Sequence, residues 1–171
     1  EHANVMAVAW INVVSSTPPT VAMGIRESRA TLELIRETGT FSVNVATASM
    51  ADVVDYCGMA TGRNADKIGT SGLTLAPGAV ISTPVIEQCP VNLECRVTEE
   101  VVVGSYVVIL GEIVETHADE SVLASPDGGI VDMEKLDPIV YIAGAREYRR
   151  LGEKVADAYS VGKPLLDGNS D

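Results

Sequence analysis

The sequence predicts an α+β domain built on a small antiparallel β-barrel with flanking helices. Its segments come in the order strands, two helices and then more strands. Two long β-branched runs, 91–103 and 105–117, are joined around Gly104, as in a long antiparallel hairpin. A doubly wound α/β fold is disfavoured, because strands and helices do not alternate regularly and neither G-x-G-x-x-G nor a P-loop motif occurs.

The first half of the chain contains the expected helices. Apolar β-like runs predict strands over 5–14, 20–25 and 40–45. Ser28 is placed to cap a helix that stops near Gly39, and Ser49 with Asp52 resembles a capping box that starts a second helix. Residues 58–83 are rich in Gly, Ser and Thr, which predicts a loop with one short helix.

The second half is more clearly β-structure. In the run 105–117 both alternating faces are apolar, with Tyr106, Val108 and Leu110 on one face and Val107, Ile109 and Ile113 on the other. Burial on both sides of a strand indicates a barrel wall that something else covers. A last strand is expected over 138–144, an amphipathic helix over 146–159 and a polar tail from about 162, all within a single domain of residues 1–171.

Composition and charge limit the classes of partner. The 171 residues carry a net charge of −12, which disfavours nucleic acid and anionic membranes as main partners. No apolar stretch approaches the roughly 20 residues of a membrane span, and Glu1 and His2 do not begin a signal peptide, so we expect a cytoplasmic protein. Three cysteines without a C-x-x-C pattern predict neither a disulfide framework nor a zinc site.

A local basic cluster, residues 25–31, follows a predicted strand and opens a predicted helix. Free N–H groups at a helix N-terminus, together with Ser28, Arg29 and Thr31, would make a seat for a phosphate group. The alternative, more common among helices, is that Ser28 only caps the helix and the arginines are solvated.

The segment 56–69 is open to two interpretations. It is either a ligand-facing loop in which Lys67 adds a second cation, or a helix end capped by Gly58 with Cys57 as a buried small hydrophobe. Cys89 and Cys95 are expected to be core thiols. His2 and His117 lie in no metal-spaced group and no G-x-S-x-G motif occurs, so no metal ligand and no catalytic side chain is predicted.

Several short motifs occur in a specific order along nearly the whole chain. They are N-x-x-A-x-A-W at 4–10, PP-x-V at 18–21, I-R-x-S-R-x-T at 25–31, F-x-V-N at 41–44, Y-C-G-x-x-x-G-x-x-x-D-K at 56–67, L-E-C-R-V at 93–97 and G-E-I-V at 111–114. This set resembles the flavin reductase-like family and is most similar to its flavoredoxin branch.

The resemblance implies an FMN-binding split barrel, an antiparallel split β-barrel, that forms a homodimer with one FMN per subunit near the dimer interface. It implies that residues from four segments bind the cofactor: Ala7, Val8, Ala9 and Trp10 against the isoalloxazine, Ser28, Arg29 and Thr31 at the phosphate, and Asn44 and Lys67 completing the ribityl and phosphate contacts.

The same resemblance implies a flavin-dependent oxidoreductase that takes electrons from NADH or NADPH and passes them to free flavin or another small-molecule or protein acceptor. The alternative is an electron carrier that a protein partner reduces. Two positions depart from the family pattern: Ala7 stands where Thr is frequent, and Tyr106 stands where many members have a His associated with the nicotinamide side. The change at Tyr106 favours the carrier.

Overall fold

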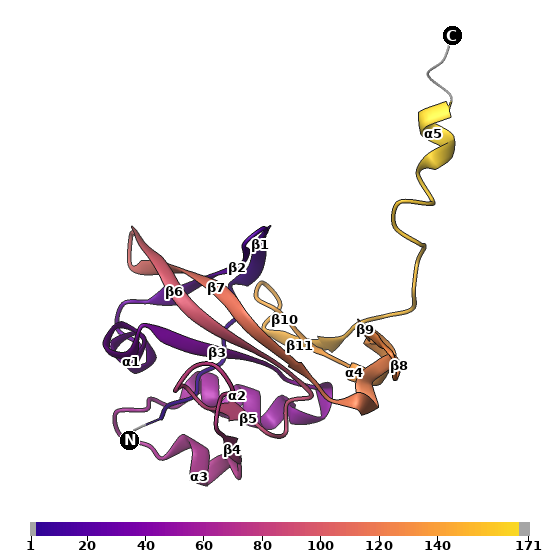
Figure 1. Ribbon diagram of the computed structural model, residues 1–171. Coiled ribbons are helices and arrows are strands. Elements are labelled where there is room, and N and C mark those ends of the chain that lie inside the picture. The colour runs from indigo at the N-terminus through magenta and orange to yellow at the C-terminus, as the bar shows by residue number, and fades with distance from the viewer. Residues whose placement is uncertain (1–2, 168–171) are drawn as a thin grey trace.

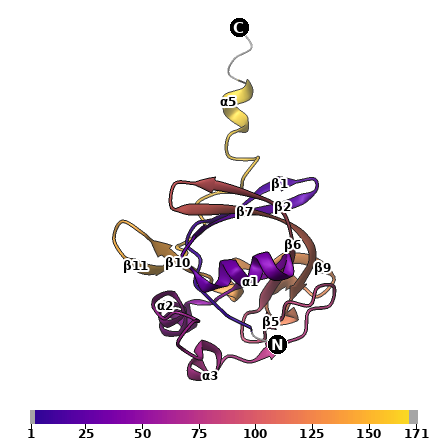
Figure 2. The ribbon, with the colours of Figure 1, turned by 90° about the vertical axis from the view of Figure 1, so that its left-hand side faces the viewer.

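A five-stranded antiparallel sheet in the order β1-β2-β7-β6-β3 forms the centre of the computed structural model, which describes residues 3–167. Its strands are β1 (Ile11–Ser16), β2 (Pro19–Arg26), β3 (Thr40–Val45), β6 (Val91–Val103) and β7 (Tyr106–Ala118). In Figure 2 the sheet curves around the helix α1 (Ala30–Thr38). The predicted α+β class, based on an antiparallel sheet, is confirmed.

The long hairpin of β6 and β7 is confirmed as well. The two strands pair from Val91 opposite Ala118 to Val103 opposite Tyr106. Gly104 lies in the turn with a φ of 58°, a left-handed conformation that glycine adopts without a steric penalty. A two-residue turn therefore closes the longest strand pair of the molecule (Figure 1).

The inner face of this sheet carries the main core. Val107 and Ile109 of β7 are buried together with Leu32 and Ile35 of α1 and with Phe41 of β3. On the opposite face of β7, Tyr106, Val108 and Leu110 are only partly buried. Of the two apolar faces predicted to be covered, the part of the chain that the structure describes covers only the inner one.

Smaller elements surround the sheet. They are a 3-10 turn at Ala48–Met50, α2 (Ala51–Met59), α3 (Lys67–Ser71), β4 (Leu75–Ala76), β5 (Val85–Ile86), a second 3-10 turn at Glu120–Val122, β8 (Leu123–Ser125), β9 (Gly128–Val131), α4 (Met133–Leu136), β10 (Ile139–Ile142), β11 (Glu147–Arg150) and α5 (Lys163–Asp167). Three two-stranded hairpins form, β4 with β5, β8 with β9 and β10 with β11.

Several predicted boundaries in the first half are wrong. The strand expected over 5–14 begins only at Ile11, because residues 4–10 find no strand partner and instead pack Met6 and Val8 against the core. Arg29, not Ser28, precedes α1, and no side chain caps that helix. The capping box is also absent from α2: Ser49 bonds the Thr47 hydroxyl, and the Asp52 carboxylate bonds the Val53 N–H.

The end of α2 and the C-terminal region differ from expectation too. Gly58 lies inside α2, which ends at Met59. The helix expected over 146–159 does not form, since Glu147–Arg150 pairs with β10. Tertiary contacts of Tyr148 explain this: its ring lies 5.3 Å from that of Tyr141, and its hydroxyl donates to Asp55 Oδ1 at 3.0 Å. Among residues 3–167 the structure contains no helix long and apolar enough to span a membrane.

Candidate functional site

Two cations meet at the end of α2. Arg29 Nη1 donates to the Gly58 carbonyl at 3.3 Å, and Lys67 Nζ donates to the preceding carbonyl, that of Cys57, at 3.0 Å. Arg29 directly precedes α1 and Lys67 is the first residue of α3, so three helices bring these side chains together. The structure thus brings together two segments that the family resemblance assigns to the cofactor.

The pair carries positive charge that no carboxylate offsets. Lys67 is only 4% exposed. Burial lowers the pKa of its ammonium group, the neighbouring Cys57 thiol opposes this, and Arg29 lowers the pKa further. None of the ion pairs among the described residues includes Arg29 or Lys67. An anionic ligand would supply the missing countercharge.

The N-terminus of α1 adds donors to the same region. Because no side chain caps this helix, its first N–H groups are free to face an anion. Thr31 accepts a hydrogen bond from Asn4 Nδ2 at 2.7 Å, which holds its hydroxyl in place. Ser28 is exposed and lines a shallow hollow of about 410 Å³ together with Arg26, Glu27 and Ser105. The free N–H groups beside Arg29 and Lys67 suit an anion such as a phosphate group, whereas the hollow that Ser28 lines includes neither of these two cations.

The segment of Ala7, Val8, Ala9 and Trp10 runs as irregular chain beside this region. Close packing fixes its start, since a Cβ on Gly62 would collide with the Asn4 side chain, and a Cβ on Gly58 would lie 3.4 Å from that of Ala7. Among the described residues, no hydrogen bond takes up the backbone N–H groups of Ala7, Val8 and Ala9. Free amides of this kind fit the polar edge of a planar heterocycle.

Trp10 and Tyr106 flank an open pocket of about 310 Å³, which Gly24, Val103 and Val108 complete. Trp10 is 57% exposed, so it is not the core anchor that a lone tryptophan usually is. Arg26 donates from Nε to the Tyr106 hydroxyl at 2.9 Å and lies 5.4 Å from the ring centroid. This hydrogen bond lowers the pKa of Tyr106.

Asn44 lies elsewhere in the hydrogen-bond network. Its side chain accepts from the Ile86 N–H at 2.9 Å and donates to Ser42 Oγ at 3.1 Å. No contact of Asn44 with Arg29 or Lys67 occurs in the described part of the chain. Of the predicted site residues, Arg29 and Lys67 are brought together, Thr31 is tied to the segment before Trp10, and Asn44 is engaged with β5.

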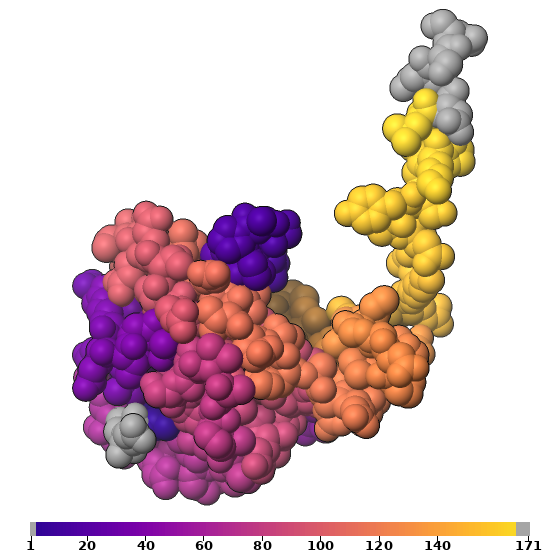
Figure 3. Space-filling model, in the orientation of Figure 1, coloured from indigo at the N-terminus to yellow at the C-terminus, as the bar shows by residue number. Residues whose placement is uncertain are grey.

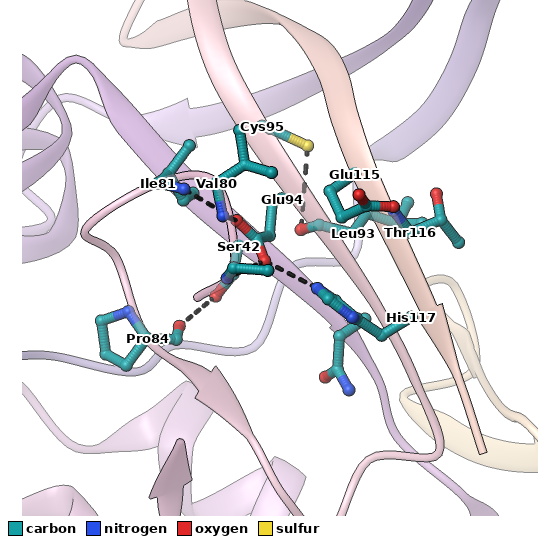
Figure 4. Close-up of polar contacts among 12 residues, drawn as sticks. Ser42, Val80, Ile81, Pro84, Leu93, Glu94, Cys95, Glu115, Thr116 and His117 are labelled. Atoms are coloured by element: carbon teal, nitrogen blue, oxygen red, sulfur yellow. Dashed lines mark hydrogen bonds and ion pairs between the residues drawn. The ribbon is translucent and has the colours of Figure 1, made fainter. Parts of the chain in front are cut away.

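A second polar cluster was not predicted. The Glu94 carboxylate is fully buried and accepts hydrogen bonds from the N–H groups of Ala79, Val80 and Ile81 at 2.6, 2.8 and 2.9 Å. His117 Nε2 lies 2.6 Å from Oε1, the oxygen that also accepts from Ala79 (Figure 4). Because side chains alternate along β6, Glu94 would lie on the face opposite to that of Leu93 and Cys95, which the sequence pattern assigns to solvent. The local sequence therefore does not show that Glu94 is buried and binds a loop.

The remaining chemistry-bearing residues are inert. Cys57, Cys89 and Cys95 are buried free thiols, which confirms the prediction for Cys89 and Cys95 and favours the buried-thiol interpretation of Cys57. Burial raises the pKa of Cys89 to about 11 and that of Cys95 to about 12, so neither forms a thiolate near neutral pH. No group of His, Cys, Asp and Glu residues within the described chain has the geometry of a metal site.

The sheet, the uncapped helix and its two cations define a flavin reductase-like split barrel, and comparison with known proteins agrees. Residues 1–152 match the family model described as flavin reductase like domain, and the chain belongs to this family. An uncharacterized protein of Archaeoglobus fulgidus is 36% identical over 128 residues, which cover 74% of this chain and 72% of that protein.

Solved structures show the same fold. Flavoredoxin of Desulfovibrio vulgaris is 33% identical with a TM-score of 0.87, and the match covers 93% of this chain and 84% of that one. Flavoredoxin from Methanosarcina acetivorans is also 33% identical, with a TM-score of 0.88 and coverages of 95% and 84%. The predicted resemblance to the family, and to its flavoredoxin branch, is confirmed.

Proposed function

We propose that this protein is an FMN-dependent oxidoreductase that works as a homodimer and accepts electrons from NADH or NADPH. The observation that carries the FMN assignment is the pair Arg29 and Lys67, two cations without a carboxylate partner beside the free N–H groups of α1. A dianionic phosphate ester matches both the charge and the donors. Solved structures of lower identity, such as an FMN-binding protein from Thermus thermophilus, share the fold.

The side chains would bind and orient the cofactor without taking part in the chemistry. Bound FMN would supply the redox chemistry, since it accepts a hydride and passes electrons on. Arg29, Lys67 and the hydroxyls of Ser28 and Thr31 would hold the phosphate. Trp10 and the free amides of Ala7, Val8 and Ala9 would flank the ring. No acid or base among the side chains is needed, which agrees with the absence of a predicted one.

A flavoredoxin-type electron carrier is the second candidate. The hydrogen bond between Arg26 and Tyr106 favours it, because this bond fixes an aromatic side chain in the wall of the pocket beside Trp10. An acidic protein with a net charge of −12 is also suited to dock with a basic redox partner.

The FMN assignment is tested by Arg29→Ala. Loss of charge-assisted hydrogen bonds, each worth roughly 1.5–3 kcal/mol, should weaken FMN binding by about tenfold to a hundredfold. Riboflavin lacks the phosphate, so its affinity should hardly change. Fluorescence titration of the flavin-free protein with each ligand measures both affinities.

Arg36→Ala is the matched control. Arg36 lies at the other end of α1 and pairs with Glu100, so its removal should leave both affinities unchanged. Equal losses for FMN and riboflavin in Arg29→Ala, or no loss for either, would show that Arg29 holds the fold and that the phosphate lies elsewhere.

A further inference from the structure

The outer face of the sheet is largely apolar and only partly covered, with Arg26 lying over the Tyr106 ring. We define it by Trp10, Val101, Val103, Tyr106, Val108 and Leu110. Residues paired across two strands lie on the same side of the sheet, and Val101 pairs with Val108 and Val103 with Tyr106. Val108 also pairs with Gly24, and Trp10 lies beside Gly24. Trp10 is 57%, Val101 42% and Val103 56% exposed. A contiguous apolar face of this kind marks an interaction surface.

The C-terminal arm, residues 151–167, is the second uncovered apolar element. Its exposed large side chains include Val155 and Tyr159, both 98% exposed, and Leu165 and Leu166, 78% and 76% exposed. In Figures 1 and 2 the arm leaves the body after β11, and α5 stands clear of every other element. The space-filling view in Figure 3 shows it equally apart from the body. The match to the family model ends at residue 152, whereas the matches to the two flavoredoxins cover 93% and 95% of the chain and so include part of the arm.

We infer that the arm of one protomer packs across the outer face of a second copy, in a reciprocal exchange. This rests on the homodimer of the proposed function, and it goes beyond it by naming the two surfaces in contact.

Three properties favour a second copy of this chain as the occupant. The arm and the outer face are both apolar and occur once per protomer, so a twofold axis satisfies both at once. An arm of this length reaches about 55 Å when extended, enough to cross to a neighbour. The residues of the arm and the outer face together number roughly 20–30 per protomer, which is the number that each partner contributes to a stable interface.

Charge favours this pairing as well. The arm contains three acidic and two basic side chains, in a protein whose net charge is −12. It is therefore a nearly neutral segment, and it can approach a second acidic protomer with little repulsion. The contact would cover the open side of the pocket beside Trp10, so one subunit would complete the other's site.

Trp10 reports the contact directly, because it is the only tryptophan. The experiment uses the full-length, flavin-free protein in a dilution series, followed by sedimentation velocity and by Trp10 emission. We expect a dimer at high concentration, with Trp10 emission moving to shorter wavelength in step with dimer formation. A monomer at all concentrations would overturn the inference.

The arm variant Val155→Asp/Tyr159→Asp/Leu165→Asp should raise the dimer dissociation constant about a hundredfold or more, since burying each apolar side chain contributes to association. These residues are exposed in the protomer, so its melting temperature should be unchanged. The control Ala156→Asp/Ala158→Asp/Ser160→Asp adds the same charge to the same arm but removes no large apolar side chain, and should dimerise within about fivefold of the original. A dimer unaffected by the arm variant overturns the inference while leaving the homodimer intact.

Mixing two variants tests the exchange itself. The face variant Val101→Glu/Val103→Glu and the arm variant should each be monomeric alone. Mixed together they should form heterodimers, because the intact arm of the first fits the intact face of the second. If the arm instead folded back onto its own protomer, mixing would rescue nothing and the Trp10 shift would not depend on concentration, which would refute the exchange. FMN is absent throughout, so these outcomes are independent of the cofactor assignment.

Discussion

Lys67 shows how one residue gains a role from its surroundings. In sequence it is a candidate second cation in a loop, and in the fold it is 4% exposed with its ammonium group bonded to the Cys57 carbonyl. Burial lowers its pKa from the ordinary 10.5, and Arg29 acts in the same direction. A buried ammonium beside a second cation is unfavourable by itself and is stabilised by an anion.

This predicts a pH dependence of FMN affinity. A phosphate binds the charged ammonium, so as pH rises the free protein loses that charge at its lowered pKa, and FMN affinity falls before pH 10.5 is reached. The measurement is the ratio of FMN to riboflavin affinity against pH, which cancels titration of the ring common to both ligands. Above about pH 7.5, where the FMN phosphate is fully dianionic, the ratio should fall with rising pH.

Lys67→Met supplies the comparison. Its affinity ratio should be about tenfold lower at neutral pH and flat as pH rises. A ratio in the original protein that is equally flat would mean that Lys67 does not face the phosphate.

At the scale of the element, Glu94 joins the loop before β5 to the central hairpin. The N–H groups of Val80 and Ile81 donate to one oxygen of its carboxylate, and the Ala79 N–H and His117 contact the other. Burial alone would raise the pKa of Glu94, but His117 and the three N–H groups lower it to about 2. A segment with little regular structure is thus fixed to β6 by a charge.

Glu94→Gln should lower the free energy of unfolding at pH 7 by on the order of 3 kcal/mol, because the amide loses the charge-assisted bonds and turns a donor toward other donors. Urea unfolding measures this. Glu115→Gln is the matched control: Glu115 pairs with Glu94 in register but is exposed, so its change should stay within about 0.5 kcal/mol. Equal effects in the two variants would contradict a special role of Glu94.

Acid should expose the same interaction. The folded-state pKa lies below the ordinary value of 4.5, so the stabilisation is complete above pH 4.5 and is lost as pH falls toward about 2. The stability difference between the original protein and Glu94→Gln should shrink across this window in urea titrations. A difference that is constant from pH 6 to the acid limit would assign the effect to packing.

At the scale of the whole molecule, the electron donor separates the two candidate functions. For the FMN-loaded protein, anaerobic stopped-flow mixing with NADH or NADPH should bleach the flavin absorption rapidly if the protein is a reductase. Reduction by dithionite but by neither nicotinamide would establish the carrier, in which Tyr106 lines the pocket beside Trp10.

The sequence by itself determined the parts of the fold that local patterns specify. Two β-branched runs around Gly104 predicted the β6–β7 hairpin, and the ordered motifs predicted the family. Each signal is short-range or is carried by the order of residues, so no knowledge of packing is needed to find it.

Only the tertiary structure decided what depends on contacts between distant segments. It placed Lys67 beside Arg29. It also buried Glu94 against the loop before β5, although alternation along β6 assigns Glu94 to the solvent face. Tyr148 turned a predicted helix into β11 by packing on Tyr141, because a side-chain contact outweighs a weak helical preference. The alternation in 105–117 predicted two apolar faces. Only the folded protomer shows that one of these faces stays partly exposed.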